Sequence, residues 1–191
     1  MTDLTMLVNA RNPLPADWVP DGLVDLWSQQ PRHFLLPMRR ELLALPAFEA
    51  ANALFAEAEA AGFDDFELRS CYRDFERQAV LFEAGPDSGF AARPGESEHQ
   101  TGLAFDVGTW HGPFLSDDNA RHRAWVADHC WDFGFVVRYP VGKEDVTGVP
   151  CEPWHLRYVG REVALEMRER GWALEEWHEA HVTANLALKA E

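Results

Sequence analysis

Apolar residues recur at spacings of three and four over residues 46–61 (PAFEAANALFAEAEAA), the pattern of an amphipathic helix. Pro46 suits the first turn of this helix, and Gly62 ends it. Start and stop signals of the same kind, such as Asp74 as a helix cap and Gly134 and Gly171 as terminators, predict further helices. These cover about residues 74–82, 116–131, 160–170 and 174–181.

Between the helices lie short runs that predict strands, at residues 66–69, 103–107, 135–138 and 154–158. Short strands separated by helices could form a parallel doubly wound sheet, but no glycine-rich phosphate loop follows any of them. We therefore expect an α+β fold. Pro13, Pro15 and Pro20 forbid a long helix near the start, so residues 1–20 are expected to form an extended N-terminal arm.

The composition limits the number of domains, the partners and the cellular compartment that can be expected. With 191 residues, 47% of them hydrophobic, residues 1–191 are expected to form one domain and a monomer. The net charge of −15 argues against nucleic acid and anionic lipid as partners. We find no signal-peptide pattern, no transmembrane segment and only three cysteines at irregular spacing, so a reducing cytoplasm is the simpler expectation. Removal of a leader would instead place the protein outside the membrane.

Two short motifs carry candidate chemistry. His99 and Asp106 lie seven positions apart across a glycine, which fits one metal ligand in a loop and the other on the strand that follows. Glu152 and His155 lie three apart. A catalytic zinc needs three protein ligands from such residue types, one open position for water and a nearby carboxylate to take the proton of that water. These four residues supply that set.

Other residues compete for these roles. His178 and His181 form an H-x-x-H pair, but the acidic residues beside them favour a solvated helix face. His111 could lie at the rim of the site, whereas His33, His122 and His129 have no local partner pattern and are expected at the surface or in the core.

Glu98 is an alternative base, but an extended loop would point it away from the metal. In a regular strand Glu152 and His155 would face opposite sides, so a bend at Pro153 is expected.

The pattern S-x-H-x-x-G-x-A-x-D followed by E-x-W-H resembles the paired signature of the VanY-type D-alanyl-D-alanine carboxypeptidases. Five blocks match this family in its order: residues 7–15, 70–78, 92–106, 133–140 and 152–160. The resemblance implies a small, mainly antiparallel sheet with packed helices and one Zn²⁺ per chain in a groove on the open face of the sheet. It implies His99, Asp106 and His155 as the ligands and Glu152 as the catalytic base.

The resemblance also implies roles in binding a substrate. Arg73 would hold the scissile carbonyl, for which its fork of donors is suited; the structural alternative is an ion pair with Asp74 or Glu76. Further substrate-binding residues by similarity, or by their place beside the motifs, are Gln78, Ser97, Arg138, Tyr139 and Trp154.

The chain departs from the family at two cysteines. Cys71 stands where relatives commonly have glycine, so it would strain the turn if that position has positive φ. Cys151 stands where an aromatic residue is usual.

The implied activity is zinc-dependent release of a C-terminal D-alanine from a peptidoglycan-derived peptide, at a D,D- or an L,D-bond. A D,D-dipeptidase and a phage-type cell-wall endopeptidase are the enzymatic alternatives. An open groove walled by residues 7–15 and 85–95 would favour longer peptides over the free dipeptide. A zinc-containing binding module without catalysis is the third class, and the presence of Glu152 argues against it.

Overall fold

The computed structural model describes residues 2–37, 40–85 and 91–183. Its main sheet has four strands in the order β3-β4-β6-β5, and every neighbouring pair is antiparallel. The strands are β3 (Phe66–Ser70), β4 (Ala104–Thr109), β5 (Phe135–Tyr139) and β6 (Glu152–Tyr158). The predicted α+β class with a small antiparallel sheet is therefore confirmed, and the part of the predicted 85–95 loop at residues 86–90 lies outside the described ranges.

A second sheet was not foreseen from the sequence. Strands β1 (Leu23–Asp25) and β2 (Leu42–Ala44) pair antiparallel, with Val24 opposite Leu43. Three residues per strand are too few to show a hydrophobic period, which explains why the sequence did not reveal them.

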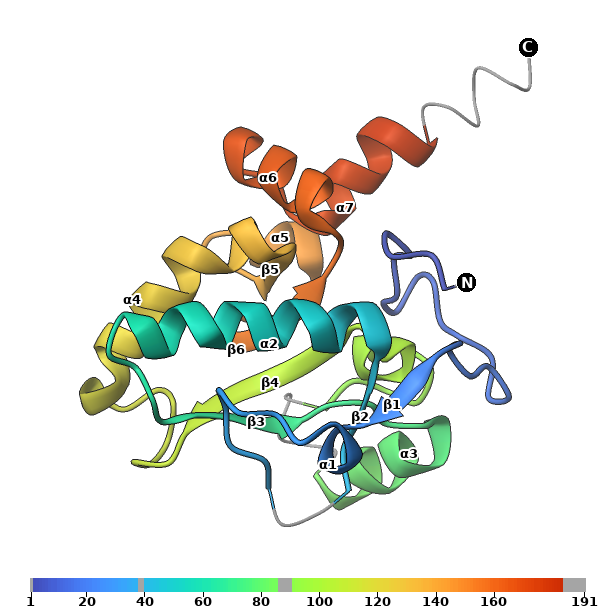
Figure 1. The fold of residues 1–191 in the computed structure, drawn as a ribbon. Helices are drawn as coiled ribbons and strands as arrows, with labels where there is room; N and C mark the ends of the chain where they lie inside the picture. Colours follow the sequence, from blue (N-terminus) through green and yellow to red (C-terminus); the bar gives the residue numbers. More distant parts are fainter. Residues whose placement is uncertain (1, 38–39, 86–90, 184–191) are drawn as a thin grey trace.

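Helices pack around the main sheet (Figure 1). Their bounds are α1 Leu26–Gln29, α2 Leu45–Ala60, α3 Phe75–Ala84, α4 Ala120–His129, α5 Glu144–Thr147, α6 Arg161–Arg170 and α7 Leu174–His178. Asp74 caps α3 as predicted, since its carboxylate accepts from the Arg77 backbone N–H at 2.7 Å. The helix predicted over residues 116–131 is instead α4 flanked by two 3₁₀ turns, the second ending at Gly134 with φ 81°.

Helix α2 covers one face of the sheet (Figure 1). The ring of Phe55 lies 5.1 Å from that of Phe66 in β3 and 6.1 Å from that of Phe105 in β4. All three side chains are fully buried, so this face is the hydrophobic core. Because side chains alternate along a strand, Asp106 points to the opposite face, away from α2.

The strand register explains how one face gathers chemistry. Asp106 in β4 stands directly opposite His155 in β6, so the two side chains lie on the same face. Between β5 and β6, Val137 pairs with Leu156 and Tyr139 pairs with Glu152, which leaves two extra residues in β6. This bulge confirms the predicted bend, and it allows Glu152 and His155 to face one site despite their odd spacing.

The first twenty residues run over the body of the protein without a helix or strand of their own in the described part. Carbonyls of Leu4 and Met6 accept from the buried guanidinium of Arg157, and Leu14 N–H donates to Gly95 O at 2.8 Å. Among the described residues, no helix has both the length and the apolar character needed to cross a membrane.

Candidate metal centre and substrate pocket

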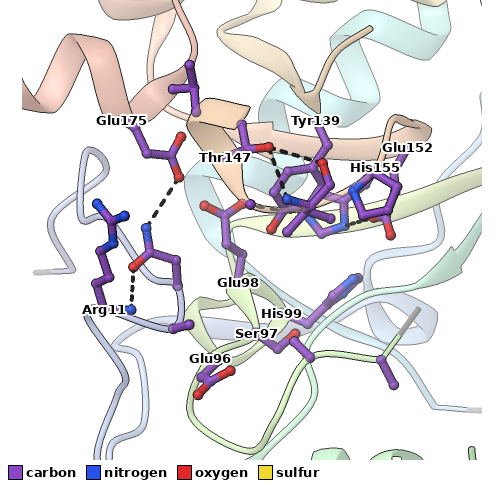
Figure 2. A pocket seen from close by; sticks show the side chains of 18 of the residues that line it. Arg11, Glu96, Ser97, Glu98, His99, Tyr139, Thr147, Glu152, His155 and Glu175 are labelled. Carbon is purple, nitrogen blue, oxygen red and sulfur yellow. Dashed lines mark hydrogen bonds and ion pairs between the residues drawn. The ribbon is translucent and has the colours of Figure 1, made fainter. Parts of the chain in front are cut away.

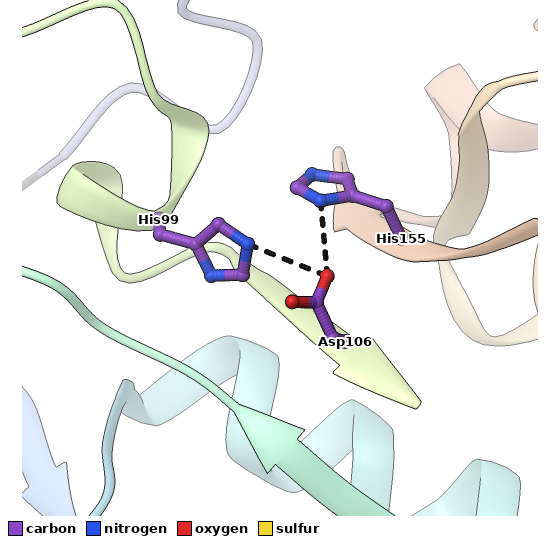
Figure 3. A group of neighbouring side chains, drawn as sticks. All are labelled: His99, Asp106 and His155. Carbon is purple, nitrogen blue, oxygen red and sulfur yellow. Dashed lines mark ion pairs between the residues drawn. The ribbon is translucent and has the colours of Figure 1, made fainter. Parts of the chain in front are cut away.

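Three side chains from different elements converge on the open face of the sheet (Figure 3). His99 belongs to a 3₁₀ turn (Glu98–Thr101), Asp106 to β4 and His155 to β6. His99 Nε2 lies 3.4 Å from Asp106 Oδ1, and His155 Nδ1 lies 3.2 Å from the same oxygen. Within the described ranges this is the only His, Cys, Asp and Glu group with metal-binding geometry.

The donor set fits zinc. Ligand atoms about 2.0–2.2 Å from a tetrahedral Zn²⁺ lie about 3.3–3.6 Å apart, close to both measured separations. Asp106 Oδ1 is buried and forms no hydrogen bond within the described structure, although two ring nitrogens approach it. The three residues therefore present lone pairs to a common point instead of satisfying one another.

Each histidine has an acceptor behind it. His99 Nδ1 lies 2.7 Å from Cys71 O, which makes Nδ1 the protonated nitrogen and leaves the Nε2 lone pair for a metal. Burial and the nearby Arg73 lower the pKa of His99 to about 4, so its ring is neutral at pH 7. Burial disfavours a charged His155, but the carboxylates of Asp106 and Glu98 raise its pKa to about 9. These carboxylates thus make the cluster favourable for a positive charge.

Glu152 lies beside this cluster at the start of β6. Its Oε2 is 3.9 Å from His155 Nδ1, and burial, together with Asp106 and Glu98, raises the pKa of its carboxyl above the ordinary value. A carboxylate with a raised pKa next to a metal position suits proton transfer. Glu98, the alternative base, is fully buried and bound by Arg138 and Arg157, so it cannot serve in that role.

A cavity of ≈ 530 Å³ opens over the cluster (Figure 2). One wall comes from the arm at residues 9–11, a second from residues 145–150 in and after α5, and a third from residues 91–92 and 96–99. Lys143 holds the second wall in place, because its ammonium lies 2.7 Å from Glu176 Oε2 in α7. Glu152 and the three candidate ligands lie at its floor.

Arg73 also lines the cavity. Its guanidinium donates to the hydroxyls of Ser70 at 3.1 Å and Ser97 at 3.4 Å, and its buried Nε has no hydrogen-bond partner in the described structure. It forms no ion pair with Asp74 or Glu76, the alternative considered from the sequence; Asp74 caps α3 instead. Arg73 therefore keeps donor capacity next to the metal cluster.

The other substrate-binding residues expected from the sequence divide into two groups. Ser97, Tyr139 and Trp154 line the cavity. Gln78 and Arg138 do not line it: Gln78 is buried and donates to Ala92 O at 2.7 Å, and Arg138 is sealed between two carboxylates. Gln78 and Arg138 are therefore not among the residues proposed to touch a substrate.

The competing histidines lie elsewhere. His111, on the turn after β4, lies 3.8 Å from Asp65, and His122 in α4 lies 2.8 Å from the same residue. His111 does not line the cavity, so it is not at the rim of the site. His181 stacks on Trp177.

Cys71 is buried at the end of β3. Among the described residues other than glycine, only Gln30 has a positive φ, so the expected strain at Cys71 is absent. Cys71 N–H donates to Glu41 Oε2 at 2.9 Å, and its carbonyl supports His99. The departure from glycine at this position therefore costs the turn no backbone strain.

Known proteins are similar to this chain in sequence and in fold. Residues 40–161 match the family model VanY, described as D-alanyl-D-alanine carboxypeptidase. A D-alanyl-D-alanine carboxypeptidase of Enterococcus faecium is 31% identical over 175 residues, which cover 90% of this chain and 56% of that protein. The chain thus spans little more than half of that relative's length.

Two solved structures are similar over most of the chain. The LD-carboxypeptidase LdcB has a TM-score of 0.78 at 33% identity, covering 91% of this chain and 84% of the other. A D,D-pentapeptidase VanY variant in complex with Zn(II) has a TM-score of 0.70 at 29% identity, covering 91% of this chain and 98% of the other. From its sequence, its fold and the His, Asp and His cluster, the chain belongs to the VanY family of D-alanyl-D-alanine carboxypeptidases.

Proposed function

We propose that this protein is a zinc-dependent carboxypeptidase that hydrolyses the bond before a C-terminal D-alanine of peptidoglycan stem peptides, at a D,D- or an L,D-bond. One observation carries the proposal: a zinc-type ligand cluster and the carboxylate of Glu152 share the floor of one cavity. Relatives that are D,D- and L,D-carboxypeptidases support the choice of substrate class.

The chemistry divides among named residues. His99, Asp106 and His155 would hold zinc, which would supply Lewis-acid polarisation and lower the pKa of the attacking water. Glu152 accepts the proton of the attacking water and returns it to the amine of the departing D-alanine. Arg73 donates to the carbonyl oxygen as negative charge develops there. Each proton thus has a carrier, and no covalent intermediate with the enzyme is needed.

The metal ligands give a direct test. His99→Ala and His155→Ala each remove one of three protein ligands, so elemental analysis is expected to find one zinc per wild-type chain and little in either variant. His111→Ala is the matched control, since that histidine is exposed and follows the end of β4, whereas His99 precedes its start. Full zinc content in both ligand variants would reject the site.

Charges around the cavity suit a peptide longer than two residues. Exposed Arg11 on the arm and half-buried Glu96 line it (Figure 2). Exposed Asp145 lines it as well, and the charged groups of these three residues form no ion pair within the described structure. A stem peptide carries a γ-linked D-Glu carboxylate and a diamino acid upstream of its terminal D-alanine. Charges of both signs on separate walls can therefore bind the part of the substrate that does not react.

We expect kcat/KM to rise by about tenfold or more, or about 1.4 kcal/mol, from free D-Ala-D-Ala to a tetra- or pentapeptide. Steady-state kinetics with released D-alanine as the readout measures this. Arg11→Met should reduce the gain for the longer peptides and leave the dipeptide rate unchanged. Equal or faster cleavage of the free dipeptide would instead favour the D,D-dipeptidase alternative.

We extend the proposal to a monomer that acts in a reducing cytoplasm, on soluble peptides. Cys130 is buried and forms no disulfide bond in the described structure. Burial raises the pKa of Cys130 to about 12, so its thiol is unreactive. Cell fractionation and the mass of the native protein test these two points.

A further inference from the structure

Glu98 directly precedes the candidate ligand His99, yet its side chain belongs to a different contact network. The carboxylate is fully buried, and Oε1 accepts from Arg138 Nε at 2.7 Å and from an Arg157 terminal nitrogen at 2.8 Å. Both arginine side chains are also fully buried. Two charge-assisted hydrogen bonds to one oxygen fix the position of this carboxylate and hold it ionised.

The second oxygen of Glu98 faces the metal cluster (Figure 2). Oε2 lies 3.5 Å from His155 Nε2, and in the described part of the chain neither atom has a hydrogen-bond partner. The other ring nitrogen, Nδ1, is the one directed at Asp106 Oδ1. His155 therefore lies between a carboxylate behind it and the metal position in front of it.

We propose that Glu98 is a positioning residue that sets the tautomer and orientation of the metal ligand His155. Its carboxylate accepts a hydrogen bond from Nε2–H, so the proton stays on Nε2 and the lone pair on Nδ1 is directed at the metal position. Carboxylates behind ligating histidines orient the ring and make it a stronger donor. Behind the other histidine ligand, His99, lies only the neutral backbone carbonyl of Cys71. The inference rests on the zinc site of the proposed function.

The same network connects the metal cluster to the arm and to α7. Arg138 also donates to both oxygens of Glu175 in α7, at 2.8 and 2.6 Å, and Glu175 in turn accepts from Asn9 of the arm. Arg157 also donates to the arm carbonyls of Leu4 and Met6. Glu98 is thus the point at which the arm, α7 and the back of a metal ligand are joined.

The decisive variant is Glu98→Gln, which preserves shape and removes the charge behind His155. We expect its zinc dissociation constant, measured by competition with a chelator, to be about 10- to 100-fold weaker than that of the wild type. The d–d spectrum of the cobalt-substituted protein should shift as well. Glu175→Gln is the matched control: it weakens the outer bonds of the same Arg138 without touching His155, so zinc affinity should stay unchanged.

If Glu98→Gln does not fold, a second variant tests the same inference. Glu98→Met combined with Arg138→Met and Arg157→Met removes the buried charges together, and apolar replacement of buried ion networks is often tolerated. It should fold and bind zinc more weakly. Wild-type zinc affinity and spectrum in either variant would overturn the inference while leaving the proposed function intact. A wild-type protein that binds no zinc would overturn both.

Discussion

Glu152→Gln is expected to retain one zinc per chain and to lose at least about 100-fold in kcat, since general acid–base catalysis contributes about 10²–10⁴-fold. The physical reason is that glutamine keeps the size of the side chain but cannot accept the proton of the attacking water. Glu152 is held against His155 at the edge of the β6 bulge, so the substitution leaves the ligands in place. Release of D-alanine from a stem peptide, with zinc content measured on the same sample, gives both quantities.

Glu144→Gln is the control for this change. Glu144 begins α5 near the second cavity wall, is exposed and does not line the cavity. Its loss should leave kcat within error of the wild type. Wild-type turnover in Glu152→Gln would assign the base to another group. Glu98 is unsuited to that role because, although burial opposes ionisation, Arg138 and Arg157 lower the pKa of its carboxyl.

Arg73→Met is expected to lower kcat by about 10²–10³-fold, the usual cost of removing a donor to a developing oxyanion. Arg73 has an unpartnered Nε within the described structure, and its other nitrogens contact only hydroxyls, so a substrate carbonyl can take up its donors. Arg73→Lys keeps the charge but loses the planar fork, and should recover only part of the rate.

The control for Arg73 lies on α3, the helix that begins two residues after it. Arg77 is exposed in the first turn of α3 and does not line the cavity, so Arg77→Met should be kinetically silent. If Arg73→Met raised KM and left kcat unchanged, Arg73 would bind the ground state and not the transition state.

Local signals in the sequence predicted most of the elements of the sheet and helices. Asp74 as a cap and Gly134 as a terminator work through contacts within a few residues, so the sequence around them is sufficient to identify them. The pairing of β1 with β2 depends on residues far apart in three-residue segments. No periodicity can reveal such a pair.

The same difference between local signals and contacts across long stretches of chain applies to the site. His99, Asp106 and His155 followed from motif spacing and the family resemblance, and the structure brings them together. Arg138 was expected to bind substrate because it lies close to the motifs. Its partner Glu98 is 40 positions away, and Arg157 is 59 positions from Glu98. A buried ion network built over such separations leaves no local pattern in a single sequence.

The bonds from Arg157 to the arm have a consequence for the order of assembly. They join residues separated by 153 and 151 positions, and contacts of such length form late in folding. On the ribosome the arm emerges long before β6, so Leu4 and Met6 must wait unpaired until almost the whole described chain has been made. The arm contacts and the metal ligand His155 therefore both depend on β6, the last strand of the described chain to be made. A nascent chain lacks a finished site in which a wrong metal could be trapped.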